Sequence, residues 1–200
     1  EIVRGAAVTR RNVLGATERA LLVVGVGLLA YAGAIYAYRE AYQIYLTWRF
    51  VPELPVSWQP SPTIAVAEGM PVANLEIPRL NLSVVVLEGV GDNILEVGAG
   101  HVPQTSLPGK SGNVAIAAHR DTFFRPLRNI QRNDVIRVTT TAGVFDYAVE
   151  WTRVVKPTDV EVLNPTEKPS LTLITCYPFH YVGSAPDRFI VRGRLISTTT

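Results

Sequence analysis

The feature that most constrains this chain is a run of 19 residues without a charge or a proline, Ala20–Tyr38 (ALLVVGVGLLAYAGAIYAY). A helix rises about 1.5 Å per residue, so this run covers roughly the hydrocarbon thickness of a bilayer. Four arginines precede the run, whereas Arg39 after it is followed at once by Glu40. Positive charge collects on the cytoplasmic side of a membrane helix. We therefore predict a cytoplasmic segment over 1–19, a transmembrane helix over 20–38 and an extracytoplasmic remainder.

A cleaved signal peptide is the alternative interpretation of the run. The run is longer than the core of a usual signal peptide, and no clear small-x-small cleavage site precedes the aromatic residues at its end. Aromatic rings suit a membrane interface, which favours an uncleaved anchor. These rings belong to Tyr36, Tyr38, Tyr42, Tyr45 and Trp48.

Residues 39–70 are predicted to form a stalk and a Pro-rich linker. The helical pattern can continue to about Arg49, but the four prolines between Pro52 and Pro62 forbid regular helix after it. Such a linker is either a semi-rigid spacer or a lid across an active site.

Composition excludes several classes of protein. The chain is 48% hydrophobic and 18% charged, which is enough apolar residue for a core and argues against disorder of the whole chain. The net charge is only +2 and the basic residues are scattered, so nucleic-acid binding is not predicted. One cysteine and three histidines build neither an intrachain disulfide nor a thiolate-rich zinc site. We predict no cofactor and no metal.

The remainder, residues 71–200, is predicted to be one mainly β domain. Short β-favouring runs are separated by Gly, Pro, Asn and Asp, which is typical of a mostly antiparallel sheet closed into a barrel or folded as a sandwich. Two connections, Asp92–Val97 and Phe124–Ile130, favour single helical turns, the first with Asp92 as a possible cap. The predicted strands are Ala73–Ile77, Leu82–Leu87, Asn113–Ala118, Val135–Thr140, Val144–Val155, Leu171–Cys176 and Arg188–Ile196.

Three residues of complementary chemistry stand at the ends of these strands. Cys176 ends one apolar strand, His119 follows another, and Arg188 opens a third. A thiolate attacks carbonyl carbon, an imidazolium protonates a leaving amine, and a guanidinium stabilises negative charge on oxygen. Together they suffice for acyl transfer. Taken singly, each also has a structural interpretation: a buried packing thiol, a hydrogen-bonded histidine, and an arginine paired with a surface carboxylate.

Other polar residues are weaker candidates. His101, which we expect in a Gly-Pro loop, and His180 could be mistaken for the base, but no strand pattern positions them. Arg120 and Asp121 are expected to shape the turn after His119, and Asp121 is a secondary candidate for orienting the imidazole. A calcium ion among Glu88, Asp92 and Glu96 would need six or more oxygens, so solvated surface acids are the preferred interpretation.

At these residues the sequence resembles the sortase family. Thr172-Leu-Ile-Thr-Cys176 resembles the sortase TLxTC signature, and Ala118-His-Arg-Asp121 resembles the histidine segment of the same enzymes. Arg188 matches the third catalytic position, Leu75-Glu-Ile-Pro78 resembles the first barrel strand, and Gly100-His-Val-Pro103 precedes the histidine strand. The HRDTFF and TCYPF segments are most similar to class D sortases.

The resemblance implies an eight-stranded β-barrel and a cysteine transpeptidase with Cys176, His119 and Arg188 as catalytic residues. Its expected partners are LPxTG-like sorting signals of secreted proteins, cut after the threonine, and an amine nucleophile of the cell envelope. A pilin polymerase would carry an Asp-Pro-aromatic lid motif, which is absent between Pro52 and Pro62. A water-using cysteine endopeptidase and a non-catalytic, membrane-tethered peptide-binding barrel remain alternatives.

Overall fold

The computed structural model describes residues 2–50, 66–181 and 183–199. The chain divides into two compact units, 1–42 and 43–200, and each is considered on its own. The predicted proline-rich part of the linker, Pro52–Pro62, lies outside the described residues.

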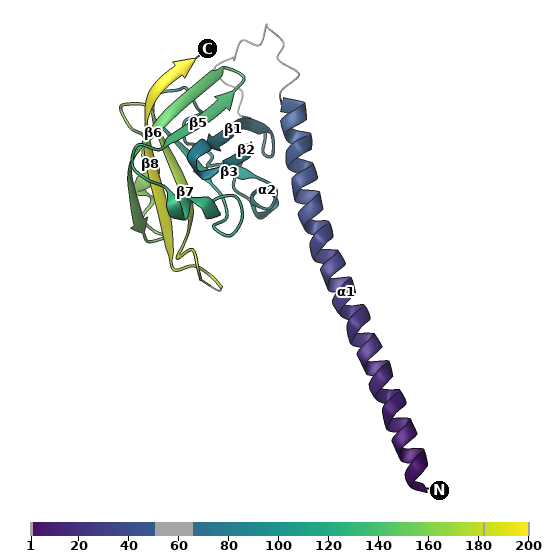
Figure 1. Ribbon diagram of the computed structural model, residues 1–200. Helices are drawn as coiled ribbons and strands as arrows, with labels where there is room; N and C mark the ends of the chain where they lie inside the picture. The colour runs from purple at the N-terminus through teal and green to yellow at the C-terminus, as the bar shows by residue number, and fades with distance from the viewer. Residues whose placement is uncertain (1, 51–65, 182, 200) are drawn as a thin grey trace. The chain divides into compact units, whose positions relative to one another are not determined.

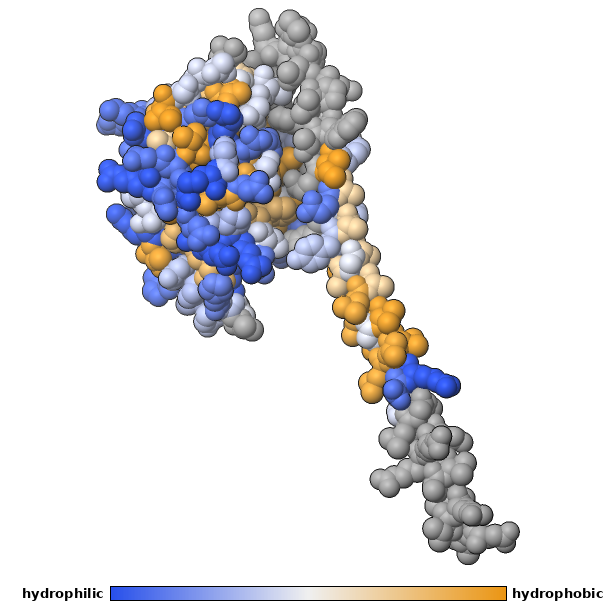
Figure 2. All heavy atoms as spheres, in the orientation of Figure 1, coloured by the Kyte–Doolittle hydropathy of each residue, from blue (hydrophilic) through white to orange (hydrophobic). Residues whose placement is uncertain are grey.

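The first unit is helical. Helix α1 runs from Ile2 to Phe50 and therefore extends beyond the predicted 20–38 span at both ends. Its Thr17–Tyr42 part is the one stretch among the described helices that is long and apolar enough to cross a membrane. The face of this part that Figure 2 shows is largely apolar, and none of its apolar window is buried inside the protein, in contrast to a helix that packs one face on a core.

The second unit is a closed barrel of eight strands in the order β1-β2-β3-β4-β7-β8-β6-β5 (Figure 1). The predicted barrel is thus confirmed, and the sandwich alternative is wrong. The strands are β1 (Pro71–Ile77), β2 (Leu82–Glu88), β3 (Ala99–His101), β4 (Asn113–Ala117), β5 (Val135–Thr140), β6 (Gly143–Val155), β7 (Ser170–Tyr177) and β8 (Asp187–Thr199). The short helices between them are η1 (Pro78–Leu80), α2 (Asp92–Leu95), η2 (Arg125–Asn129) and η3 (Val160–Leu163).

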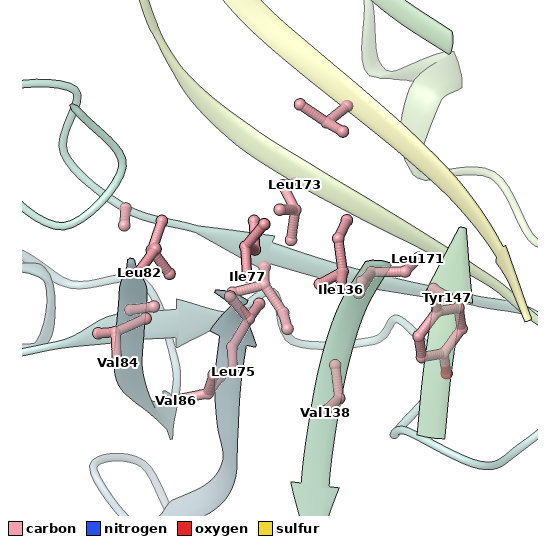
Figure 3. Close-up of a cluster of buried hydrophobic side chains, with 14 of the residues drawn as sticks. Leu75, Ile77, Leu82, Val84, Val86, Ile136, Val138, Tyr147, Leu171 and Leu173 are labelled. Carbon is pink, nitrogen blue, oxygen red and sulfur yellow. The ribbon is translucent and has the colours of Figure 1, made fainter. Parts of the chain in front are cut away.

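Alternating apolar side chains fill the barrel. Successive residues of a strand point to opposite faces, so every second residue of β1 and β5 is buried. Figure 3 shows the resulting cluster, in which side chains from strands far apart in sequence point toward one another. Leu75, Ile77, Ile136, Leu171 and Leu173 are among its fully buried members. This core gives the strands that carry the candidate residues a rigid support.

Two features of the barrel differ from the sequence-based expectation. Strand β3 was not predicted, because its three residues Ala-Gly-His contain neither alternation nor β-branched side chains. It pairs in parallel with β2 and antiparallel with β4, and it places His101 in a buried strand instead of a loop. The predicted cap of α2 is also wrong: Gly91 is the N-cap, and Asp92 is the first helical residue.

Candidate active site

The pairing of β7 with β8 brings two of the predicted residues together. These strands are antiparallel, and their register sets Cys176 directly opposite Arg188. Both side chains are half-buried. The backbones of paired residues in adjacent strands lie about 5 Å apart, so the thiol and the root of the guanidinium side chain are neighbours.

The third residue reaches the same place through the parallel pair β4–β7. Ala117 is level with Ile174 in this pair, and the pairing continues past the end of β4. The Ala118 N–H donates to the Ile174 carbonyl at 3.2 Å, and the Thr175 hydroxyl donates to the Ala118 carbonyl at 2.7 Å. The same register, carried on by one more residue, brings His119 level with Cys176.

The alternation of side chains decides which face these residues occupy. Leu171, Leu173 and Val191 point into the core, so Cys176 and Arg188 lie on the outer face of the barrel. In β4, Val114 and Ile116 point into the core, which assigns His119 to the outer face as well. We call His119, Cys176 and Arg188 the catalytic row, after the role that the sequence predicts for them: Cys176 and Arg188 are paired across β7 and β8, and His119 follows the end of β4 on the same face.

Arg188 is held by backbone carbonyls. Its Nη1 donates to the Asp187 carbonyl at 3.0 Å and to the Ala185 carbonyl at 3.3 Å. The carboxylate of Asp187 instead accepts a hydrogen bond from Lys156 Nζ at 2.7 Å. Within the described part of the chain no ion pair involves Arg188, so the structural interpretation of a surface ion pair finds no support there.

Arg120 links the turn after His119 to the β7–β8 connection. Its Nη2 donates to the carbonyls of Tyr181 at 2.6 Å and Gly183 at 3.2 Å, and its guanidinium lies 5.7 Å from the centroid of the Tyr181 ring. Sequence reasoning assigned this arginine only to a local turn. The missed signal is its chemistry, since a five-donor side chain next to an irregular connection can satisfy several carbonyls at once.

The connection after Cys176 is also fixed by aromatic packing. Phe179 contacts Phe189 edge-on at 5.3 Å between ring centroids, and Tyr177 stacks on Phe189 at 6.2 Å. Phe179 and Phe189 are packed against the barrel core. The segments next to Cys176 and Arg188 are therefore anchored to the interior.

The other histidines occupy different environments. His101 is buried, and its Nδ1 lies 2.7 Å from a Glu88 carboxylate oxygen while its Nε2 lies 3.1 Å from the Ser106 carbonyl. Both ring nitrogens are thus engaged in the barrel wall. His180 and Asp121 are exposed.

The predicted surface acids separate in the structure. Glu88 is half-buried against His101 and is not a solvated acid, whereas Asp92 and Glu96 are exposed. Across the described ranges, no group of three or more His, Cys, Asp or Glu side chains is placed to hold a metal ion.

The comparison with protein families matches the sortase domain to residues 75–196. The chain belongs to the sortase family. Solved structures agree: a Sortase D5 transpeptidase from Clostridium perfringens has a TM-score of 0.61 at 31% identity, over 66% of this chain and 83% of that one. Sortase E from Streptomyces avermitilis has a TM-score of 0.57 at 32% identity, over 66% and 92%.

Curated relatives support the class assignment. Sortase D of Bacillus subtilis is 36% identical over 124 residues, which are 62% of this chain and 63% of that protein. Sortase SrtE1 of Streptomyces coelicolor is 33% identical over 147 residues, or 64% and 41% of the two chains. The match thus spans less than two thirds of either relative. The predicted resemblance to class D sortases is confirmed by these similarities.

Proposed function

We propose that this sortase is a cysteine transpeptidase that cuts an LPxTG-like sorting signal after its threonine and transfers the acyl part to an amine of the cell envelope. The observation that supports this most is the catalytic row, in which a thiol and a guanidinium are paired across β7 and β8 and an imidazole follows the end of the neighbouring strand β4 on the same outer face. A buried packing thiol would not need these two neighbours.

In the proposed reaction, the Cys176 thiolate forms a bond to the carbonyl carbon of the threonine, and Arg188 stabilises the negative charge that develops on the carbonyl oxygen. The C–N bond then breaks, and protonated His119 gives its proton to the leaving amine. The product is a thioester on Cys176. An incoming amine attacks this thioester, neutral His119 takes up the proton of the amine, and the C–S bond breaks to restore the thiolate and the imidazolium.

The proposed placement is an enzyme anchored in the cytoplasmic membrane, with its N-terminus inside and its catalytic domain outside. We retain the division into a cytoplasmic segment over 1–19, a transmembrane helix over 20–38, a stalk and Pro-rich linker over 39–70 and a catalytic domain over 71–200. Anchoring enzyme and substrate to one surface raises their effective concentration, which suits a reaction between two envelope molecules.

The test uses the full chain in detergent micelles with a library of LPxTx peptides. We expect intact mass spectrometry to find a peptide fragment ending at threonine attached to Cys176, and added amine to release it as an amide. Cys176→Ala should form no adduct, and His119→Gln should form it at a rate reduced by at least about 100-fold, the usual contribution of a positioned acid or base.

The alternatives predict other outcomes. A water-using endopeptidase forms the adduct but yields the free acid with and without amine. A non-catalytic peptide-binding barrel forms no adduct, and its thiol resists a methanethiosulfonate at neutral pH. Transpeptidation that survives Cys176→Ala would contradict the enzyme proposal itself.

A further inference from the structure

The outer face of β4, β7 and β8 carries a second polar cluster, apart from the catalytic row. The Val162 carbonyl of η3 accepts hydrogen bonds from Asn113 Nδ2 and from Arg192 Nη2, each at 2.9 Å. Asn113 Oδ1 accepts from the Thr172 hydroxyl at 2.6 Å, and Arg192 Nη1 donates to the Ser170 hydroxyl at 3.0 Å. All four of these side chains are at most 8% exposed. The cluster thus joins three strands to the β6–β7 connection, residues 156–169.

Arg192 is an unusual residue to find buried. Among the ion pairs of the described residues none includes Arg192, since Glu150 lies 3.8 Å from Arg194 instead. Its guanidinium lies 5.4 Å from the centroid of the Trp151 ring, and burial lowers its pKa. The Glu150 carboxylate acts on Arg192 only as a weaker attraction that opposes this shift of the pKa, and no carboxylate forms an ion pair with it among the described residues. A buried cation of this kind is costly, and an apolar side chain of similar volume would fill the same space at a lower cost. Packing alone therefore does not account for this arginine.

The position of the cluster relates it to the catalytic row. Arg192 is level with Thr172 in the β7–β8 register, four residues along the strand from Cys176. At about 3.3 Å per residue the two rows are about 13 Å apart on the same face. Between them lies an apolar strip, of which Ala117 and Ile174 are partly exposed while Ile190 beside them is buried.

An extended peptide fits this spacing. The four residues that precede the cleaved bond in an LPxT segment span about 13 Å at the same rise. A peptide whose last carbonyl lies at Cys176 and whose chain runs back over the apolar strip would meet the β6–β7 connection at its far end. The opposite direction leads off the end of β7, where the chain turns away into the β7–β8 connection.

We infer that Arg192 and Asn113 are positioning residues. They hold the Val162 carbonyl and so keep the β6–β7 connection in place, and this connection bounds the far end of the site for the acyl part of the peptide. The inference rests on the proposed function and adds residues that touch no reacting atom. Its consequence is a site for the peptide that exists before the peptide binds, since the connection is held by the protein's own buried donors.

The decisive variant is Arg192→Met, which keeps most of the side-chain length and removes the donors. Its matched control is Arg194→Met, two residues along β8, where the side chain is exposed. Full-length protein in micelles is assayed with the peptide that acylates Cys176 of the wild type fastest, which gives kcat and KM. The rate of Cys176 modification by methyl methanethiosulfonate and the rate of Glu-C cleavage after Glu161 are measured on the same protein.

We expect Arg192→Met to cut faster after Glu161 and to raise KM by about tenfold, with kcat and thiol modification within about twofold of wild type, because only peptide binding is weakened. Arg194→Met should change none of these values. Arg192→Gln, which keeps a polar group in the cluster but does not reach Val162, should behave like Arg192→Met, and it provides the test if the methionine variant does not fold.

Two results would overturn the inference. One is an unchanged KM in a variant whose Glu161 bond has become sensitive. The other is an equal fall of kcat and thiol modification, which would mean that the cluster supports the barrel as a whole. If the wild type forms no thioester with any peptide, the proposed function fails, and the part of the inference that concerns peptide binding fails with it. The rate of cleavage after Glu161 still decides whether Arg192 holds the connection.

Discussion

Thr175→Val removes the hydrogen bond that joins β7 to the end of β4 and leaves the shape of the side chain almost unchanged. Thr175 is 2% exposed, and its hydroxyl donates to the Ala118 carbonyl at 2.7 Å. Valine replaces the hydroxyl by a methyl group, so no cavity forms. The Ala118 carbonyl stays buried and loses this hydrogen-bond donor. Such a loss costs about 1–3 kcal/mol. For a domain of this size, 1 kcal/mol shifts Tm by about 3–5 °C, so a fall of about 3–15 °C is expected.

The same change acts on the catalytic row because Ala118 directly precedes His119. We expect the acylation rate at saturating peptide to fall by about tenfold, as a less firmly placed imidazole protonates the leaving amine less often. Circular dichroism gives Tm, and intact mass spectrometry gives the rate. Thr175→Ser is the matched control, since it keeps the hydroxyl and should retain the rate within about threefold. A Thr175→Val variant that melts and acylates like the wild type would refute this account of the β4 end.

Three further predictions concern the barrel. The Arg79 guanidinium lowers the pKa of Asp134, so the stability that this ion pair adds is full above the unfolded pKa and is lost as pH falls through the folded pKa. Asp134→Asn should therefore lower the free energy of unfolding by about 1–3 kcal/mol at pH 7 in urea unfolding, and the difference from wild type should shrink as pH falls through the folded pKa. If the free energies of unfolding of Asp134→Asn and wild type differed by the same amount at every pH, the stabilisation would not come from this ion pair. Gly100→Ala would place a Cβ 2.2 Å from a backbone oxygen, against 3.2 Å from the nearest atom for Gly193→Ala, so the first should lower Tm clearly more than the second. His101→Gln should lower Tm but leave the acylation rate of the folded fraction unchanged, and an activity loss like that of His119→Gln would assign His101 to the site.

Local pattern was enough to find most of the strands. Alternation of apolar residues is a property of neighbouring positions, so Val135–Thr140 was predicted with the bounds that the structure has, and the neighbours of Cys176 were assigned to a strand. The apolar run that begins at Ala20 was recognised for the same reason. The short strand β3 escaped because three residues hold too little pattern, and His101 was consequently expected in a loop.

The sequence by itself determined which side chains could take part in acyl transfer, because Cys176 is the one cysteine of the chain and a thiol is a soft nucleophile wherever it stands, while its neighbours set how much of it is thiolate. Only the tertiary structure decided which residues lie near this thiol: the β7–β8 register sets Arg188 opposite Cys176, and the contact between β7 and the end of β4 joins residues 57 positions apart in the chain, next to His119. It alone also showed that Arg192 and Asn113 share the Val162 carbonyl. Pairing between distant strands depends on how the whole barrel closes over its core, and no short stretch of residues carries that information.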